Sequence, residues 1–373
     1  MLKAVVILIS SLFITGSSNY YNVIGFWQVI HTKANPLQIY WQFPRYFKKH
    51  IDKLPNNVVA LLARGAIPTA QLHHALNLLA TGEEQTAQRY WQKSLPKLSS
   101  KERIKLAKQL LLYKQWEDLH YLAAANYIEQ PQILNQLYLK QGVDHHKLSE
   151  NFLQRLGFLS LNSNIQPSNR CMYNVLMMSD HRKGLYKLAK LVTSYNIKPE
   201  PSSNIFCFTD PVYVSGEISC ATLKTSAATC NWQAATLDKA LLARFDFIIM
   251  MPKNGSANVH RNIMQLSSDA NYNVFLHELM HFSGFEDEYP LPRAKQAWLC
   301  QMSGLVAPNL FIVQKGELAP KGWYKSKSCQ EGGTAYKPSK DWSILEYQQL
   351  GLSEQYRALW FSHISALHNA KVN

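Results

Sequence analysis

Two histidines and a glutamate stand at a spacing that suits a metal centre. The chain reads His277-Glu278-Leu279-Met280-His281 within the apolar stretch Tyr272–Phe282. Residues four apart on an α-helix lie on one face, one turn apart, so both imidazoles can reach the same metal ion. Glu278 follows the first histidine, where its carboxylate can take a proton from water held by that ion. The pattern H-E-x-x-H therefore predicts a zinc centre that activates water.

The residues after His281 supply a turn and a third candidate ligand. Gly284 comes three residues after His281, and Asp287 comes six residues after it. A glycine can end a helix in the left-handed conformation, which lets the chain fold back toward the metal. A carboxylate is an ordinary zinc ligand. Asp287 is therefore the expected third metal ligand, and its neighbours Glu286 and Glu288 remain alternatives.

The longer pattern H-E-x-x-H-x-x-G-x-x-D resembles that of the metzincin superfamily of zinc peptidases, with Asp287 where the superfamily usually has a third histidine. It is similar in particular to the snapalysin-like members, which have Asp at this place. The run Asp287-Glu288-Tyr289 also resembles the D-E-Y ending of the bacterial IgA-peptidase-like group, whose spacing is one residue longer. The motif-specific part covers Phe275–Pro290, and the fold-level resemblance covers about Cys171–Ala358. It implies a zincin catalytic domain with bound Zn²⁺ and peptide-bond hydrolysis with Glu278 as general base.

The same resemblance implies an apolar turn beneath the metal, followed by a tyrosine. Ser343-Ile344-Leu345-Glu346-Tyr347 is similar to that turn, with Leu345 in the position of the usual methionine. The base of a metal site needs an apolar floor, which leucine supplies. Tyr347 would then approach the metal or the developing oxyanion as a catalytic residue. Cys300-Gln301-Met302-Ser303 is a competing match that keeps the methionine and lacks the tyrosine.

Other patterns in the chain favour no second catalytic chemistry. The sequence has no P-loop, no G-x-G-x-x-G fingerprint and no G-x-S-x-G elbow. A gluzincin needs a glutamate about 20 or more residues beyond the second histidine. The first acidic residue after Glu288 is Glu317, whose Gly and Pro neighbours are typical of a loop. The pairs His73–His74 and His145–His146 are expected on solvated helix faces and not on a metal ion. His260, which could line the cleft, is kept out of the site.

The N-terminus carries a targeting pattern. Lys3 precedes the apolar run Ala4–Ile14, and the small residues Gly16 and Ser18 follow it. This order is typical of a cleaved signal peptide. The run is shorter than the ~20 residues that span a bilayer. Residues 1–18 are therefore expected to be a signal peptide, or a membrane anchor if cleavage does not occur.

The placement of the cysteines agrees with export. All six lie between Cys171 and Cys329, and an even set confined to one region is typical of disulfides in an oxidising compartment. No C-x-x-C pair occurs, which argues against a cysteine zinc site. Their short separations favour the pairs Cys220–Cys230 and Cys300–Cys329. The protein is therefore expected in the periplasm or among secreted proteins.

Length and patterning predict an α+β protein of two domains. A chain of 373 residues with 47% hydrophobic and 17% charged residues suits two folded domains. Residues 19–160 are expected to form an α-helical domain whose helix pairs resemble tetratricopeptide-type repeats. Residues 161–373 alternate strands and helices and contain the H-E-x-x-H helix, as expected of a metzincin-like α/β domain. The helices and strands expected are helices at 70–79, 83–97, from Ser99 onward, 116–127, 131–142, 183–195, 237–245 and 272–282, the last capped at Ser268-Asp269, and strands at 173–178, 205–208, 247–251 and 263–266.

The expected function is that of a zinc-dependent endopeptidase acting on a peptide or protein substrate outside the cytosol. The net charge of +14 is not gathered into a dense basic block, so a solvated basic surface is favoured over a nucleic-acid partner. The helical domain could bind a protein partner. The alternative function is a helical-repeat binding protein that carries a weak or inactive peptidase domain, and the intact Glu278 argues against it.

Overall fold

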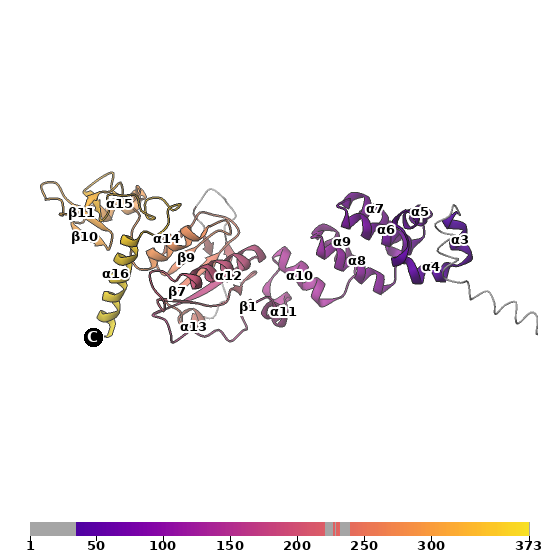
Figure 1. Ribbon diagram of the computed structural model, residues 1–373. Helices are drawn as coiled ribbons and strands as arrows, with labels where there is room; N and C mark the ends of the chain where they lie inside the picture. The colour runs from indigo at the N-terminus through magenta and orange to yellow at the C-terminus, as the bar shows by residue number, and fades with distance from the viewer. Residues whose placement is uncertain (1–34, 221–226, 228, 232–238, 373) are drawn as a thin grey trace, which may run out of the picture. The chain divides into compact units, whose positions relative to one another are not determined.

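The computed structural model describes residues 35–220, 227, 229–231 and 239–372. The expected α+β class is confirmed, because the described residues hold fourteen α-helices and a mostly parallel sheet (Figure 1). The chain forms two compact units, Met1–Leu137 and Tyr138–Asn373. The expected signal peptide at residues 1–18 lies outside the described residues.

The first unit consists of short helices that bury their apolar faces against one another. Trp91 is fully buried among leucine and alanine side chains of the neighbouring helices. The helix that begins at Ser100 starts with a capping box, in which Ser99 and Glu102 bind each other's backbone N–H groups. Gly82 takes a positive φ of 82° just after α6, as expected of a helix stop. The helices are α3 (Pro36–Gln42), α4 (Pro44–His50), α5 (Asn56–Arg64), α6 (Pro68–Ala80), α7 (Glu84–Ser94), α8 (Ser100–Leu112) and α9 (Trp116–Ala124), with 3₁₀ turns at Ile51–Lys53 and Leu95–Lys97. The helix α10 (Pro131–Gln141) begins in this unit and ends beyond its last residue, Leu137.

The second unit is built on a seven-stranded sheet with the order β1-β4-β2-β7-β9-β8, where β3 also pairs with β2. The pairs are parallel except β8 with β9, which is antiparallel and ends the sheet. Its strands are β1 (Leu159–Ser160), β2 (Tyr173–Ser179), β3 (Phe206–Phe208), β4 (Val212–Tyr213), β7 (Phe247–Met251), β8 (Asn258–His260) and β9 (Ile263–Gln265). The expected strands at β2, β3, β7 and β9 are confirmed within one or two residues.

Both faces of this sheet are buried. Alternate residues of β2 point to opposite faces. Val175 and Met177 pack with α12 (Arg182–Ile197) and α14 (Tyr272–Phe282) in one core, and Leu176 and Met178 join a second core with α13 (Lys239–Leu242). Continuous apolar strands such as β2 and β7 are typical of parallel sheets that are covered on both faces.

The boundary between the units lies earlier than the 160/161 position expected from composition. The helix α11 (Glu150–Arg155) and β1 belong to the second unit, because Leu159 pairs with Val212 of β4 in parallel. Phe152 and Leu153 are buried with Tyr213 of the same strand. The polar run near residues 161–169 is thus a loop inside the sheet domain and not a linker before it.

The helix α14 has the bounds that its sequence predicts, but its cap is a different residue. Asn271 directly precedes the helix, and its side-chain oxygen accepts a hydrogen bond from Val274 N at 3.0 Å. Ser268 and Asp269 lie too far upstream to act as the N-cap, because a cap side chain must reach the N–H groups of the first turn. The Asp269 carboxylate instead pairs with Lys183 at 2.6 Å.

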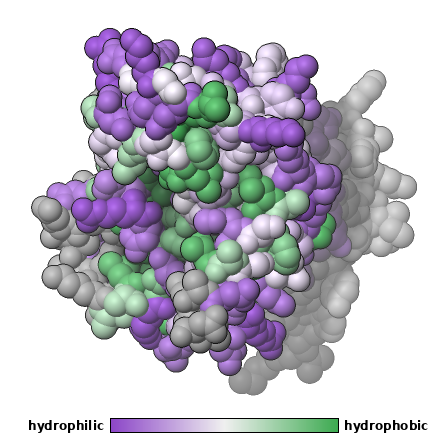
Figure 2. All heavy atoms as spheres, turned by 90° about the vertical axis from the view of Figure 1, so that its left-hand side faces the viewer, coloured by the Kyte–Doolittle hydropathy of each residue, from purple (hydrophilic) through white to green (hydrophobic). Residues whose placement is uncertain are grey.

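The C-terminal part of the second unit adds a small antiparallel sheet that the sequence analysis did not predict. Its strand order is β10-β11-β13-β12, and Leu310, Ile312 and Ala335 form its core with residues of α15. The elements are α15 (Arg293–Leu299), β10 (Gly304–Ala307), β11 (Leu310–Val313), β12 (Tyr324–Lys325), β13 (Thr334–Lys337) and the last helix α16 (Glu354–Val372). Figure 2 shows the molecule from the left-hand side of Figure 1, where apolar residues gather near the centre of the face and hydrophilic residues surround them.

Three disulfides stabilise the second unit. Both expected pairs, Cys220–Cys230 and Cys300–Cys329, are confirmed, and the third is Cys171–Cys207. The pair Cys220–Cys230 joins β5 (Ser219–Cys220) to β6 (Cys230–Asn231). Such cross-links indicate an oxidising compartment. Among the described residues, none of the helices has the length and apolar character needed to cross a bilayer.

We expect Cys300→Ser with Cys329→Ser to lower the free energy of unfolding by about 3–4 kcal/mol, because the bond closes a loop of 29 residues in the unfolded chain. Denaturant titration of the purified double variant and the wild type measures this difference. Two coincident unfolding curves would contradict the stabilising role.

Candidate metal centre

The side chains of His277, His281 and Asp287 converge on one point. The Nε2 atoms of the two histidines lie 3.1 Å apart. The Oδ1 atom of Asp287 lies 3.1 Å from the first and 3.2 Å from the second. Ligands bound to one zinc ion at about 2.0–2.1 Å in a tetrahedron are about 3.3 Å from one another. The three donor atoms therefore already have the spacing that such an ion requires.

The outer nitrogen of each histidine is held by a backbone carbonyl. His277 Nδ1 lies 2.9 Å from the Ile344 carbonyl oxygen, and His281 Nδ1 lies 2.7 Å from that of Phe285. A carbonyl can only accept, so each Nδ1 carries a proton, and once the imidazole is neutral its Nε2 presents a lone pair. Metal-bound histidines in proteins are oriented in this way.

Three lone-pair atoms facing one another are unfavourable unless a cation lies between them. Asp287 Oδ1 is buried and has no hydrogen-bond donor in the structure. Although burial opposes the shift, His277 and His281 hold the pKa of Asp287 well below its ordinary value. Burial likewise opposes a cationic His281, yet Asp287 raises the pKa of that imidazole to about 9. The centre thus favours positive charge, and its donor set fits a divalent metal.

Glu278 lies beside this centre and contributes no donor atom to it. Its side chain is buried, and burial raises the pKa of its carboxyl above the ordinary value, against the lowering effect of His281 and His277. It lines a cleft of about 760 Å³ together with His281, Asp287 and Tyr289. A carboxylate at this place can exchange a proton with a water bound in the cleft.

Local structure explains why Asp287 reaches the metal position. Gly284 has a φ of 80° after the last turn of α14 and reverses the chain, as expected from the sequence. Glu286 is drawn to Lys295, with which it forms an ion pair. Glu288 points the opposite way, into the protein, and is fully buried. Of the three neighbouring carboxylates, the structure brings only Asp287 to the two histidines.

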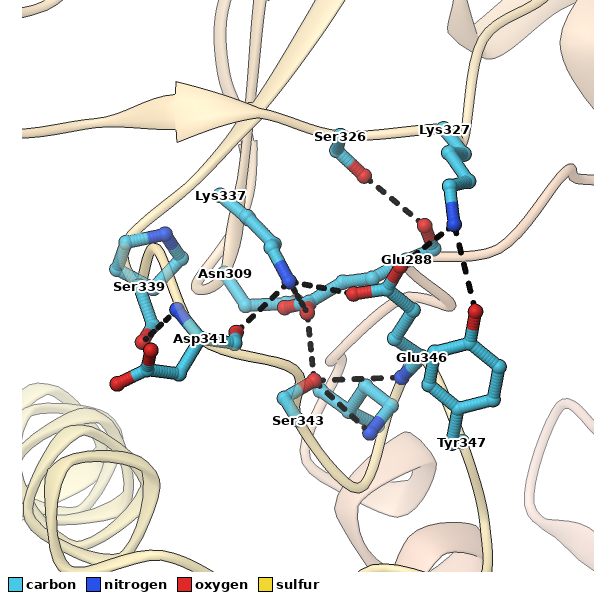
Figure 3. Close-up of polar contacts among 12 residues, drawn as sticks. Glu288, Asn309, Ser326, Lys327, Lys337, Ser339, Asp341, Ser343, Glu346 and Tyr347 are labelled. Carbon is cyan, nitrogen blue, oxygen red and sulfur yellow. Dashed lines mark hydrogen bonds and ion pairs between the residues drawn. The ribbon is translucent and has the colours of Figure 1, made fainter.

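Glu288 is the centre of a buried polar network (Figure 3). Its backbone is also fixed, because Glu288 N donates to the Leu345 carbonyl at 3.0 Å and Ser328 Oγ donates to the Asp287 carbonyl at 2.8 Å. Lys337 Nζ lies 3.6 Å from the carboxylate and compensates its charge. The hydrogen bonds to the carboxylate come from Asn309 Nδ2 at 2.9 Å, Ser343 Oγ at 2.5 Å and Tyr356 Oη at 2.5 Å.

The turn Ser343–Tyr347 lies next to the candidate metal centre, and both of its apolar residues, Ile344 and Leu345, are buried. Leu345 is fully buried, and the Ile344 carbonyl orients His277. Met302, in the competing match, is half exposed after α15. The Tyr347 hydroxyl points toward Lys327, whose Nζ lies 3.4 Å away (Figure 3), and its ring packs on Trp342.

The tyrosine that lines the cleft is Tyr289, which the sequence analysis quoted only as part of the D-E-Y run. Its ring lies parallel to that of His277, with the centroids 6.4 Å apart. Burial and the neighbouring Asp287 carboxylate raise the pKa of its hydroxyl, so the group is a proton-bearing donor at neutral pH. In the sequence, the position of Tyr289 two residues after the third candidate ligand was the signal that could have identified it as a cleft residue.

The other histidines and Glu317 lie in different surroundings. His260 lines the same cleft from β8, next to Arg261. Glu317 accepts from Ser303 Oγ at 2.6 Å in an exposed loop, which does not suit a metal ligand. The expectation of a solvated helix face is wrong for His145, which is buried at the start of the 3₁₀ turn His145–Lys147 and is held by contacts with Ser215.

No protein-family model matches the sequence, and no curated protein shows significant similarity to it. The interpretation of the centre therefore depends on its geometry and on the motif.

We expect Asp287→Ala to weaken zinc binding by more than the ~10–100-fold that loss of a hydrogen-bonding partner of a ligand causes, because it removes a donor atom. Asp287→His should restore part of the affinity. Glu286→Ala is the matched control and should bind zinc as the wild type does, since its carboxylate pairs with Lys295. Competitive zinc titration measures all three. Normal affinity in Asp287→Ala would exclude it as a ligand.

Proposed function

We propose that the chain is a zinc-dependent endopeptidase that acts outside the cytosol. The observation that carries this proposal is the triangle of His277 Nε2, His281 Nε2 and Asp287 Oδ1 beside Glu278 at the cleft. Three protein ligands leave one coordination position open, as in catalytic zinc sites. The resemblance of the motif to metzincins points to the same reaction.

A bound zinc ion would supply a Lewis acid that polarises the substrate carbonyl and acidifies water. Glu278 then acts as the general base and takes the proton of the attacking water. It later delivers that proton to the nitrogen of the leaving amine. The burial of this carboxyl suits both steps, because burial favours its neutral form once the proton is taken. His277 and His281 keep their orientation through the Ile344 and Phe285 carbonyls.

The cleft suits an extended peptide. The edge strand β8, Asn258–His260, lines it and is the last strand of the sheet among the described residues. An extended chain can add to such an edge through backbone hydrogen bonds that do not depend on the side chains. Trp298 and Pro292 provide apolar surface on α15 and just before it. These features support a peptide or protein substrate.

We expect Glu278→Gln to lower peptide hydrolysis by about 10²–10⁴-fold, the usual contribution of general acid–base catalysis, and to leave bound zinc unchanged. Glu286→Gln, an acid in the same cleft, is the matched control. Rates are measured on an unstructured protein such as casein, with zinc content determined in parallel. Hydrolysis by Glu278→Gln at the wild-type rate would rule out the proposed base.

We expect Tyr289→Phe to lower kcat by about 10²-fold, because a hydroxyl donor to the developing oxyanion would be lost. Tyr347→Phe should change kcat far less, since that hydroxyl points toward Lys327. The two variants lose the same atom, so their kcat ratio separates the two roles. A larger loss in Tyr347→Phe would reverse the assignment.

A further inference from the structure

A second group of metal-ligating side chains lies away from the cleft. Asp144, His145 and His146 follow α10 and place their ligand atoms within 4.8 Å of one another. Glu217, between β4 and β5, lies against both histidines. We propose that these four residues bind a second divalent transition-metal ion of the zinc class, which links the segment before α11 to the loop after β4.

The two segments are held together by hydrogen bonds that do not involve the four side chains. His145 N donates to the Ser215 carbonyl at 2.8 Å, and Ser215 Oγ donates to the Gly142 carbonyl at 2.7 Å. Gly216 has a φ of 90°, and a Cβ there would lie 2.5 Å from Asp144 Oδ2. Only glycine allows this close approach. The ligand side chains are therefore arranged on a fixed frame.

The donor atoms are close to the spacing of a metal site. His145 Nδ1 lies 3.5 Å from Asp144 Oδ1 and 3.8 Å from Glu217 Oε1. His146 Nε2 lies 3.6 Å from the same Glu217 oxygen. A tetrahedral zinc site has donors about 3.3 Å apart, so these three separations exceed that spacing by only a few tenths of an ångström.

The surroundings of His145 Nδ1 favour a cation. The Ser215 carbonyl lies 3.3 Å from this nitrogen, farther than the 2.9 and 2.7 Å of the carbonyls that hold His277 and His281, and it joins the Asp144 and Glu217 oxygens around the nitrogen. A single N–H can donate well to one of these three oxygens, whereas a metal ion attracts the nitrogen and both carboxylates at once. Two imidazoles with two carboxylates suit zinc and its neighbours better than calcium or magnesium, which prefer oxygen ligands alone.

The site can load from solvent and has the composition of a structural site. The side chains of His146 and Asp144 are 66% and 44% exposed, so an ion can enter, while His145 is buried. Four protein ligands fill a tetrahedral ion and leave no position for a substrate. The expected effect is stabilisation of the second unit by bound metal, without a contribution to hydrolysis.

The test uses the full chain with His277→Ala, which removes the first centre, and adds His146→Ala or Glu217→Gln. His146 is chosen because its side chain is 66% exposed, so its removal leaves no buried cavity. His368→Ala, in an exposed part of α16, is the matched control. Each protein is loaded with zinc and dialysed against metal-free buffer, and zinc per chain and the melting temperature are measured.

We expect two zinc ions in the wild type, one in His277→Ala, one in His277→Ala with His368→Ala, and none once His146→Ala or Glu217→Gln is added. The zinc-dependent rise in melting temperature of His277→Ala should disappear in the same variants. Zinc absent from His277→Ala after dialysis, or retained there with His146→Ala added, would overturn the second site. A wild type that loses zinc through His146→Ala and not through His277→Ala would instead contradict the proposed function.

Discussion

The candidate metal centre depends on the hydrogen bonds that the buried carboxylate of Glu288 accepts. This carboxylate receives a hydrogen bond from Ser343, and the same turn presents the Ile344 carbonyl to His277. Asp287 directly precedes Glu288. The hydrogen bond from Ser343 to Glu288 therefore fixes the position of Asp287, from the loop, relative to His277, from the helix. A carboxylate with no exposure is costly unless all its lone pairs are satisfied, and here three donors and Lys337 compensate it.

These supporting groups explain why the domain continues so far beyond its motif. Asn309 comes from the turn between β10 and β11 and Lys337 from β13 (Figure 3). Tyr356 comes from α16. None of these elements supplies a metal ligand. Trp360 of α16 also donates its indole N–H to Ser283 Oγ at 2.8 Å, at the end of α14. The small sheet and the last helix thus hold Glu288 and Ser283 in place beside the candidate centre, so the geometry of the centre depends on their folding.

The sequence predicted the parts of the centre that local rules control. The histidine spacing on α14, the turn at Gly284 and the offset of Asp287 all lie within a few residues, so helix geometry decides them. The direction of Tyr347 could not be predicted, because it depends on Lys327, a neighbour in space from another loop. The second sheet was missed for a similar reason, since β11 pairs with β13 across the intervening residues 314–333. His145 was misplaced because its burial comes from a contact with Ser215, 70 residues away.

The two proposed metal sites differ in how many donors the chain would supply, and this difference would separate their roles. The first would have three donors beside Glu278 and a cleft, so under the proposed function its remaining position would face the substrate. The second would have four donors, which fill a tetrahedral ion. Glu217 lies just before β5, where the Cys220–Cys230 disulfide closes a hairpin. A metal ion and a disulfide would then restrain neighbouring parts of the segment after β4, at Glu217 and at Cys220. Such cross-links would suit the proposed function, because a loop that opens less often is cleaved less often by a peptidase.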